Sequence, residues 1–388
     1  MPQAQPMLEI DNWGRIVMNS IAIGHAPKTA GDATHRPRHR PYSLRTWNAA
    51  AAAMVLSTAL HSQISLADEG GVSFWLPGQF GSLAAVPQQP GWSLATVAYH
   101  TSVDAGGDVA FARQVTRGGI TVNFPGNVNA NLKADANLAL AVPTYVFASP
   151  VLGGQLGVSM AGIFGRNKAS VDATLTGAGP FGFTVGGGRS DSVTGFGDLY
   201  PQATLRWNQG VNNFMTYVMG DIPVGAYDPN RLANLGVGHG AIDAGGGYTY
   251  FNPQTGHEFS AVTGLTYNFK NTDTNYQNGV DWHLDWGASQ FVSKQLHIGL
   301  VGYVYNQLTG DSGAGDRVGD FKSRVVGIGP QLGYIFPVGD HQGYLNFKAY
   351  KEFDASHRAD GWNAWVTFVI SPAAPGEAPP ARRPMITK

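Results

Sequence analysis

The sequence predicts an all-β fold, a transmembrane antiparallel up-and-down β-barrel of about twelve strands. Three observations predict it. Polar and apolar residues alternate over long stretches, long and short connections alternate along the chain, and charged residues make up only 13% of it. Soluble domains usually carry about 25% charged residues. No stretch after residue 67 approaches the roughly 20 apolar residues that a membrane-spanning helix needs.

Both ends of the chain are expected to lie outside the barrel. Residues 1–67 are typical of a secretory signal peptide with an extended basic region, because several arginines precede the apolar run Ala49–Leu60 and Ser65–Ala67 supplies the small residues of a cleavage site. A short membrane anchor is the alternative, but the run is too short to span a bilayer. Residues 372–388 are rich in Pro and Ala, which predicts a disordered tail.

Residues 68–91 connect the expected signal peptide to the first strand. They are too rich in Gly and Pro to form one regular strand. They also contain a cluster of large apolar side chains, which are Phe74, Trp75, Leu76 and Phe80. If the segment trailed into the periplasm, this cluster would be exposed to water. The sequence therefore favours a segment that folds back as a plug into the barrel mouth, with a trailing segment as the alternative.

Residues 92–371 contain the alternating segments of the predicted barrel. Because successive side chains of a strand point to opposite faces, each segment has one polar and one apolar face. In GFGDLYPQATLRW (residues 195–207), for example, polar residues alternate with Leu199, Ala203 and Leu205. The segments begin near Trp92, Asn127, Gln155, Thr194, Asn213, Val237, His257, Gly279, Gln295, Lys322, Gln342 and Gly361.

The surroundings of a membrane barrel decide which face of each strand points outward. In lipid the apolar face is outside and the polar face lines the lumen. Aromatic residues near strand ends, such as Tyr267 and Tyr334, fit the interfacial belts of such barrels. The polar faces therefore predict the following lumen-lining residues: Asn129, Asn131, Lys133, Asp135, Asp198, Tyr200, Gln202, Arg206, Glu258, Lys270, Asp281, His283, Asp285, Gln331, Lys348 and Glu352.

The connections between the segments alternate in length. Those near residues 151 and 208, and the sequences NPQTG, SKQ and PVGD, are short. The intervening ones, such as residues 105–126, residues 172–192 and EFDASHRAD (residues 352–360), are longer. Outer-membrane barrels have short periplasmic turns and longer extracellular loops. The order predicts that both ends of the barrel lie on the periplasmic side.

Five stretches carry a resemblance to a known family over residues 71–371. They are GFGDLYPQATLRW, GDIPVGAYDPNRLANLG, NTDTNYQNGVDWHLDW, GYVYNQLTGDSG and VVGIGPQLGY, in this order. The chain resembles the outer-membrane barrel family associated with the meta-pathway of phenol degradation, whose members are described as transporters. The resemblance implies a location in the outer membrane of a Gram-negative bacterium and uptake of small hydrophobic or aromatic compounds. The expected partners are outer-membrane lipid, such a solute and the outer-membrane assembly machinery.

Composition and spacing argue against other function classes. The chain has no Cys, and a net charge of -1 gives no electrostatic basis for nucleic-acid binding. Asp281, His283 and Asp285 alternate on one face and could share a metal, but a polar lumen wall gives the same pattern. We therefore expect no metal, no cofactor and no cofactor-binding or catalytic residues.

Two alternatives to selective transport stay open at this point. One is a general or structural outer-membrane barrel. The other is a lipid-modifying enzyme of the outer membrane with a Ser and His pair. Ser289 and His283 share a predicted face, but they lie roughly 20 Å apart along one strand, too far for a hydrogen bond. This makes an enzyme the weaker alternative, and we expect none.

Overall fold

A computed structural model describes residues 73–106, 126–177, 183–314 and 322–373. The expected signal peptide and the tail from residue 374 lie outside the described residues. No helix long and apolar enough to cross a membrane occurs in the described part of the chain.

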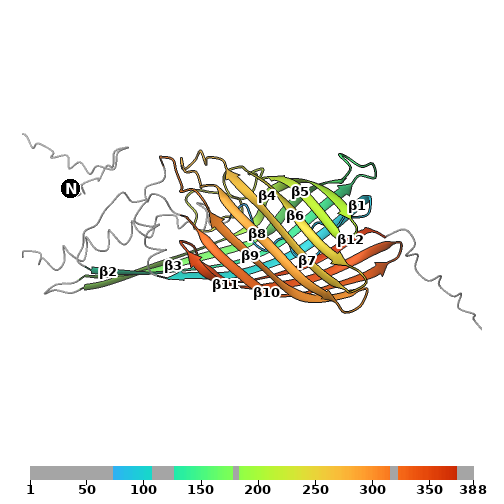
Figure 1. Cartoon of the computed structure of the whole chain (residues 1–388). Helices are drawn as coiled ribbons and strands as arrows, with labels where there is room; N and C mark the ends of the chain where they lie inside the picture. Colours follow the sequence, from blue (N-terminus) through green and yellow to red (C-terminus); the bar gives the residue numbers. More distant parts are fainter. Residues whose placement is uncertain (1–72, 107–125, 178–182, 315–321, 374–388) are drawn as a thin grey trace, which may run out of the picture. The chain divides into compact units, whose positions relative to one another are not determined.

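Twelve antiparallel strands form one closed barrel within the described residues, and each strand is paired with its neighbours in the chain (Figure 1). Pairing of the first strand with the last, from Leu94 opposite Ile370 to Asp104 opposite Asp360, closes the barrel. Closure leaves no strand edge, so the backbone groups of the wall pair with one another, as lipid requires. The strands are β1 (Gly91–Gly106), β2 (Gly126–Val146), β3 (Gln155–Gly177), β4 (Phe183–Gln209), β5 (Asn212–Gly220), β6 (Ala241–Asn252), β7 (His257–Asn268), β8 (Asp281–Phe291), β9 (Leu296–Gln307), β10 (Arg324–Val338), β11 (His341–Ser356) and β12 (Asp360–Pro372). The predicted fold class and strand number are confirmed.

Short turns and both ends of the barrel share one end of it. The β4–β5 and β10–β11 turns have two residues each, 210–211 and 339–340, because Gln209 pairs with Asn212 and Val338 with His341. At the opposite end, residues 221–240 form a long connection between β5 and β6. Two connections that were expected to be long are mostly strand. The first is residues 172–192, where β3 and β4 pair out to Gly177 and Phe183. Likewise, β11 continues to Ser356 and leaves only residues 357–359 before β12.

The outer surface of the wall is apolar around its middle. Leu265 on β7 and Leu300 on β9 are 50% and 53% exposed, while Val262 and Val301 on the opposite faces of these strands are buried. Aromatic side chains lie toward the strand ends, where Tyr267 packs against Phe269. An apolar outside that is flanked by aromatic residues matches a barrel surrounded by lipid. We therefore place the barrel in a lipid membrane.

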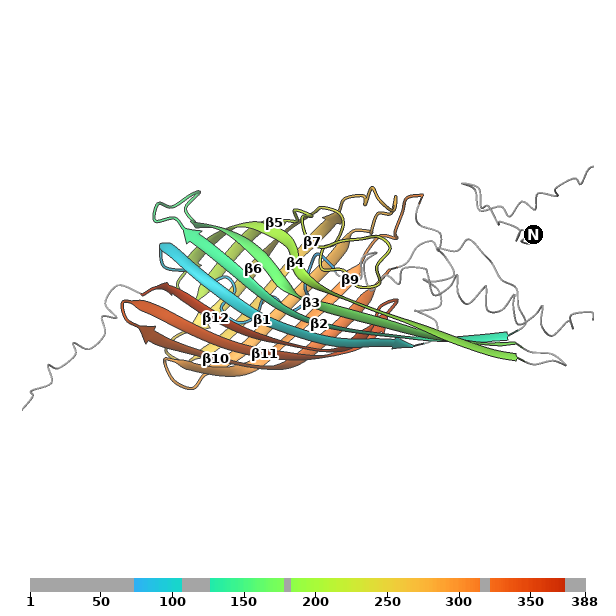
Figure 2. The ribbon, with the colours of Figure 1, turned by 180° about the vertical axis from the view of Figure 1, so that it is seen from behind.

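Three neighbouring strands are much longer than a membrane requires. β2, β3 and β4 have 21, 23 and 27 residues, whereas about 9–11 residues are enough to span a bilayer. Figures 1 and 2 show these strands running past the rest of the barrel at the end opposite the short turns. The outer parts of β2, β3 and β4 therefore lie beyond the lipid.

The lumen assignment of four residues on β2 was wrong. Asn129, Asn131 and Lys133 are exposed, and Asp135 lies on the same outward face, whereas Leu132 and other apolar residues of β2 are buried inside. The assignment assumed lipid outside the whole strand. Because this part of β2 extends into water, the ordinary rule of soluble proteins applies, and the polar face points outward.

Candidate functional site

The N-terminal segment (residues 73–90) lies in the barrel lumen, where charged wall residues bind its backbone. The Asp285 carboxylate on β8 accepts hydrogen bonds from the backbone N–H groups of Gly78 and Phe80, both at 3.0 Å. From β11, three strands along the wall, the Lys348 ammonium donates to the carbonyl oxygens of Gly78, Gln79 and Phe80 at 2.6, 3.0 and 3.2 Å. A carboxylate and an ammonium thus hold both polar sides of the same short stretch of backbone.

Further contacts continue along the N-terminal segment toward β1. The N–H of Leu83 donates to the Glu258 carboxylate at 2.9 Å, and the N–H of Ala85 donates to the Thr249 hydroxyl at 3.0 Å. The Gln331 amide donates to the Ser82 hydroxyl at 2.5 Å. Because these partners come from β6, β7 and β10, the N-terminal segment is bonded to several sides of the barrel.

Apolar side chains of the N-terminal segment pack against aromatic residues of the wall. Trp75 is buried and stacks on the His283 ring, with centroids 3.4 Å apart and planes at 16°. His283 is in turn bonded to the Asp243 carboxylate at 2.9 Å. Phe80 lies 5.9 Å from Tyr217, and Leu76 packs against the same buried cluster. These contacts remove the apolar side chains from water, which is the driving force expected for such a cluster.

Gly78 permits the closest approach between the N-terminal segment and the wall. Its φ of +87° lies in the left-handed region, which side chains disfavour. A Cβ atom at this position would lie 2.9 Å from the Tyr350 ring. Tyr350 also donates to the Gly78 carbonyl at 3.2 Å. Both the backbone conformation and the packing therefore require glycine here.

A cavity of about 100 Å³ lies between the N-terminal segment and the inner faces of the long strands. Ser73, Trp75 and other residues of the segment form one side of it. Its apolar wall residues include Val103, Ala136, Leu138 and Ile163. Its polar wall residues include Thr101, Asn167, Tyr200, Glu352, Arg358 and Asn363. A mostly apolar cavity with a few polar groups is typical of a small-molecule site.

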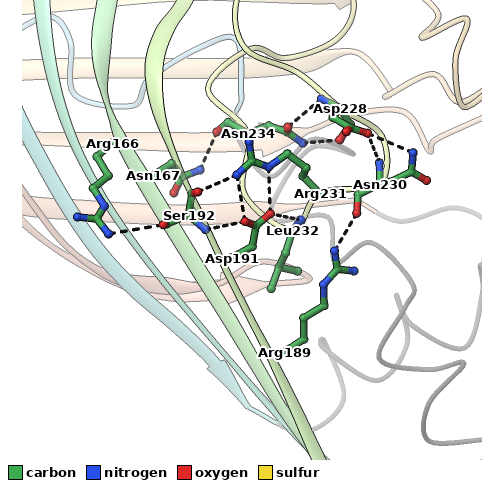
Figure 3. Close-up of polar contacts among 10 residues, drawn as sticks. All are labelled: Arg166, Asn167, Arg189, Asp191, Ser192, Asp228, Asn230, Arg231, Leu232 and Asn234. Atoms are coloured by element: carbon green, nitrogen blue, oxygen red, sulfur yellow. Dashed lines mark hydrogen bonds and ion pairs between the residues drawn. The ribbon is translucent and has the colours of Figure 1, made fainter.

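The β5–β6 loop (residues 221–240) covers this region and contributes Leu235 to the cavity wall. The buried Asp198 carboxylate accepts hydrogen bonds from the N–H groups of Gly225 and Val237, both at 2.6 Å. Figure 3 shows a second attachment nearer the loop tip, where Arg231 pairs with Asp191 of β4 at 3.1 Å. Asp198 is therefore a structural anchor of the loop and not a free charge of the lumen.

The two attachments of the loop should differ in strength. Asp198→Asn replaces a buried acceptor of two N–H groups, so we expect the loop to be held more weakly by about 1–3 kcal/mol. Arg231→Gln removes a partly exposed pair, which should cost less than about 1 kcal/mol. The rate of protease cleavage within residues 221–240, in detergent-folded protein, measures the difference. Faster cleavage for Arg231→Gln than for Asp198→Asn would contradict this ranking.

Asp221, at the start of this loop, makes the folding stability of the protein depend on pH. It follows β5, and both of its buried carboxyl oxygens lack a hydrogen-bond partner. Burial, with a further contribution from the charge of Asp198, raises the pKa of Asp221 from 3.8 to about 8. The folded state therefore binds a proton that the unfolded state releases between these values, so folding stability falls as the pH rises from about 4 to 8.

The replacement Asp221→Asn should remove this dependence. At about pH 3 the variant and the parent should have similar free energies of unfolding, because both side chains are then mostly neutral in the folded and in the unfolded protein. At pH 9 the variant should be more stable, since one pKa unit corresponds to about 1.4 kcal/mol. Guanidinium unfolding followed by tryptophan fluorescence at both pH values measures the effect. Parallel pH profiles for the two proteins would contradict it.

The other residues assigned to the lumen, except Lys270, lie on inward faces of the strands. Tyr200, Arg206, Glu258, Asp281, His283, Asp285, Gln331, Lys348 and Glu352 are buried on inward faces, and Gln202 is half-buried on the same face as Tyr200. Lys270 was assigned wrongly. β7 ends at Asn268, and Lys270 is exposed in the following connection, where Asn271 pairs with Tyr276 and turns the chain.

Charged and polar residues of the lumen are used mainly in binding other parts of the chain. Asp281 accepts a hydrogen bond from Asn268 at 2.9 Å, and His283 and Asp285 bind Asp243 and the N-terminal segment, respectively. Within the described residues, no three His, Asp or Glu side chains are placed to hold a metal ion. Ser289 is bonded to His297 at 3.2 Å and not to His283.

Several residues of the site could not be recognised from the sequence. Asp243 lies in the glycine-rich stretch AIDAGGG, and Arg358 lies in a short turn, so neither belongs to a long alternating pattern. The pair Asp191 and Arg231 is 40 residues apart in the chain. Only the aromatic cluster of the N-terminal segment carried a local signal, because large apolar residues in a Gly- and Pro-rich stretch need a partner.

The closed barrel, its apolar exterior and the bonded N-terminal segment define a membrane β-barrel of the outer-membrane class. The chain belongs to the family described as "Putative MetA-pathway of phenol degradation", whose model matches residues 113–368. This agrees with the resemblance found in the sequence motifs. No protein with a curated description matches the chain.

Three solved structures are similar to this chain, and the first of them shows the same fold. An outer membrane channel from Pseudomonas putida F1 is 13% identical, and the match covers 76% of this chain and 99% of that one with a TM-score of 0.54. A FadL homologue from Pseudomonas aeruginosa is 10% identical, with 80% and 98% coverage and a TM-score of 0.34. The transport unit of the Escherichia coli autotransporter AIDA-I is 11% identical, with 84% and 98% coverage and a TM-score of 0.36.

Proposed function

We propose that the protein is an outer-membrane channel for the uptake of small hydrophobic or aromatic compounds, and that the N-terminal segment is its plug. The observation that carries the proposal is the mostly apolar cavity between that segment and the wall. A solute that enters it meets Leu138, Ile163 and aromatic neighbours in place of water. The family description, which refers to phenol degradation, supports the same solute class.

The position of the N-terminal segment favours selective over general transport. A general porin needs a continuous wet path, whereas Asp285 and Lys348 hold the segment inside the lumen. A segment fixed in this way leaves little room for water and ions. Apolar solutes gain free energy by leaving water for the cavity, so they can bind where hydrated ions cannot.

An enzyme of the outer membrane is supported less well. Ser289 and His297 form a Ser–His pair, but Ser289 also bonds to Ser82 of the N-terminal segment and to Gln331. Both residues are buried, and neither lines the cavity. The pair is therefore better explained as part of the network that holds the N-terminal segment, and we propose no catalytic residues.

A pair of variants on β2 tests the transport function. Ala136 lines the cavity, and Ala139 is exposed on the opposite face. In a strain without its own copy, the protein should raise uptake of labelled phenol but not of a sugar of similar size. Ala136→Phe should abolish most of that increase by filling the cavity, while Ala139→Phe should preserve it. Equal uptake through both variants, or equal gains for phenol and sugar, would favour a general or structural barrel.

A further inference from the structure

Arg206 is a buried arginine without an acidic partner. Its side chain is only 9% exposed and lies on the inward face of β4, close to the β4–β5 turn. Among the described residues no ion pair joins Arg206 to a carboxylate, whereas Arg231 and Arg324 pair with Asp191 and Asp354. Burying a charge is costly unless an opposite charge compensates it. Arg206 therefore lacks the counter-charge that a buried guanidinium needs.

The guanidinium of Arg206 also has more N–H groups than the protein uses. Nε donates to the Ala84 carbonyl at 3.4 Å, and Nη1 donates to the Thr204 hydroxyl at 2.7 Å. Nη2 has no hydrogen-bond partner in the described part of the chain, and it is not one of the atoms that are closed off from solvent. By contrast, Lys348 uses its N–H groups on three carbonyl oxygens of the N-terminal segment. A guanidinium has five N–H donors, so Arg206 can bind a further acceptor.

Arg206 lines a pocket of about 240 Å³ at the end of the barrel that has the short turns. The connection between β2 and β3 (residues 147–154) and Pro87 of the N-terminal segment form other parts of its wall. Gln155 and Asn208 add amide side chains to the lining. The pocket is larger than an engineered cavity of about 150 Å³ that holds benzene. A group as small as acetate or phosphate therefore fits beside the guanidinium.

We propose that this pocket binds an oxyanion, a carboxylate or phosphate group, through Arg206. Two oxygens of one such group accept hydrogen bonds from Nη1 and Nη2, the paired geometry that guanidinium groups favour. The short turns of an outer-membrane barrel face the periplasm. The oxyanion is therefore either a free anion of the periplasm or the phosphate of a lipid headgroup in the adjacent leaflet. The pocket shares no lining residue with the cavity of the proposed function, so the inference does not depend on transport.

Phosphorus NMR titration tests the binding on protein that is folded in a maltoside detergent, which contains no phosphorus. The probes are inorganic phosphate and dihexanoyl phosphatidylglycerol below its micelle concentration. Acetate should displace bound phosphate, and glycerol, which is neutral, should not. A free-anion site should bind inorganic phosphate at least as tightly as the lipid, whereas a headgroup site should prefer the lipid. Failure of both probes to bind would overturn the proposal.

Variants of Arg206 assign the binding to its guanidinium. Arg206→Gln should weaken binding of the preferred probe by about tenfold to a hundredfold, the usual contribution of a hydrogen bond to a charged group. Arg206→Lys keeps the charge but loses the paired donors, so its affinity should lie between those of the parent and Arg206→Gln. Arg324→Gln is the control, because Arg324 is exposed and pairs with Asp354. Unchanged affinity in Arg206→Gln would overturn the proposal.

A second pair of variants tests the charge while Arg206 is kept. Gly157 on β3 lies beside the guanidinium, since a Cβ atom there would be 3.8 Å from Nη1. Gly157→Asp supplies a carboxylate from within the protein, which should pair with Arg206 and remove most of the oxyanion binding. Gly157→Asn has nearly the same shape without the charge, so it should retain more of the binding. Heat-modifiable migration on a gel confirms that each variant is folded, and unchanged affinity in folded Gly157→Asp would overturn the proposal.

Discussion

Replacing Leu300 by arginine should destabilise the folded barrel by about 2–4 kcal/mol. Leu300 lies near the middle of β9, and its side chain is 53% exposed on the outer surface. Its neighbours across the strand pairs are Ala288 on β8 and Pro330 on β10, which offer no partner for a charge. In lipid, a guanidinium at this depth must lose water or distort the bilayer.

The matched control is Asn131→Arg. Asn131 is also exposed on the outward face of a strand, but it pairs with Gly106 at the end of β1, beyond the last pair of β1 with β12, which is Asp104 with Asp360. Water surrounds that part of β2, so the free energy of unfolding of the variant should be within about 0.5 kcal/mol of that of the parent. Guanidinium unfolding in lipid vesicles measures both variants. If Asn131→Arg is as destabilising as Leu300→Arg, the long strands lie in the membrane and our placement of its boundary is wrong.

The barrel could be predicted from the sequence because its signals are local. Alternation along one strand, as in residues 281–289, needs only the two-residue period of the strand. Tight turns such as that before Asn212 are also local, and together these signals predicted a closed barrel of about twelve strands. Strand ends were less predictable. β4 begins at Phe183 and not near Thr194, because nothing in the pattern shows where the membrane ends.

The faces of β2 show why local patterns are insufficient. The pattern around Lys133 separates a polar from an apolar face correctly, but its direction depends on whether lipid or water lies outside. That environment depends on how far the strand extends beyond the ends of the other strands. The outward position of Lys133 therefore follows from the three-dimensional arrangement of β2, β3 and β4, which no window of the sequence contains.

The candidate site depends even more on distant contacts. Lys348 binds the carbonyl of Gly78 across 270 residues, and Asp285 binds the same residue across 207. Both charges were expected in the lumen, but the sequence did not show that they bind the backbone of the N-terminal segment. Arg358 gave no signal at all, since a basic residue in a turn is usually solvated.

Releasing the N-terminal segment from the lumen should turn the barrel into an open pore. The variant Gly78→Val introduces a Cβ 2.9 Å from the Tyr350 ring and forces a side chain into the left-handed region. The segment must then move away from Lys348 and Asp285, and water can enter its place. We expect the single-channel conductance in a planar bilayer to rise by roughly tenfold, because a twelve-stranded wall encloses a water path once it is empty. Deleting residues 73–86 should produce at least the same increase.

Gly153→Val separates this effect from backbone strain alone. Gly153 also has a positive φ, +72°, but nothing lies within 4 Å of a Cβ at its position in the β2–β3 turn. This variant should therefore fold with a similar strain and keep the low conductance of the parent. The open variants should at the same time lose the preference for phenol over sugar, because the cavity needs Trp75 and Leu76 as one of its walls. A large conductance in the parent, or an equal one in Gly78→Val and Gly153→Val, would show that the N-terminal segment does not close the lumen.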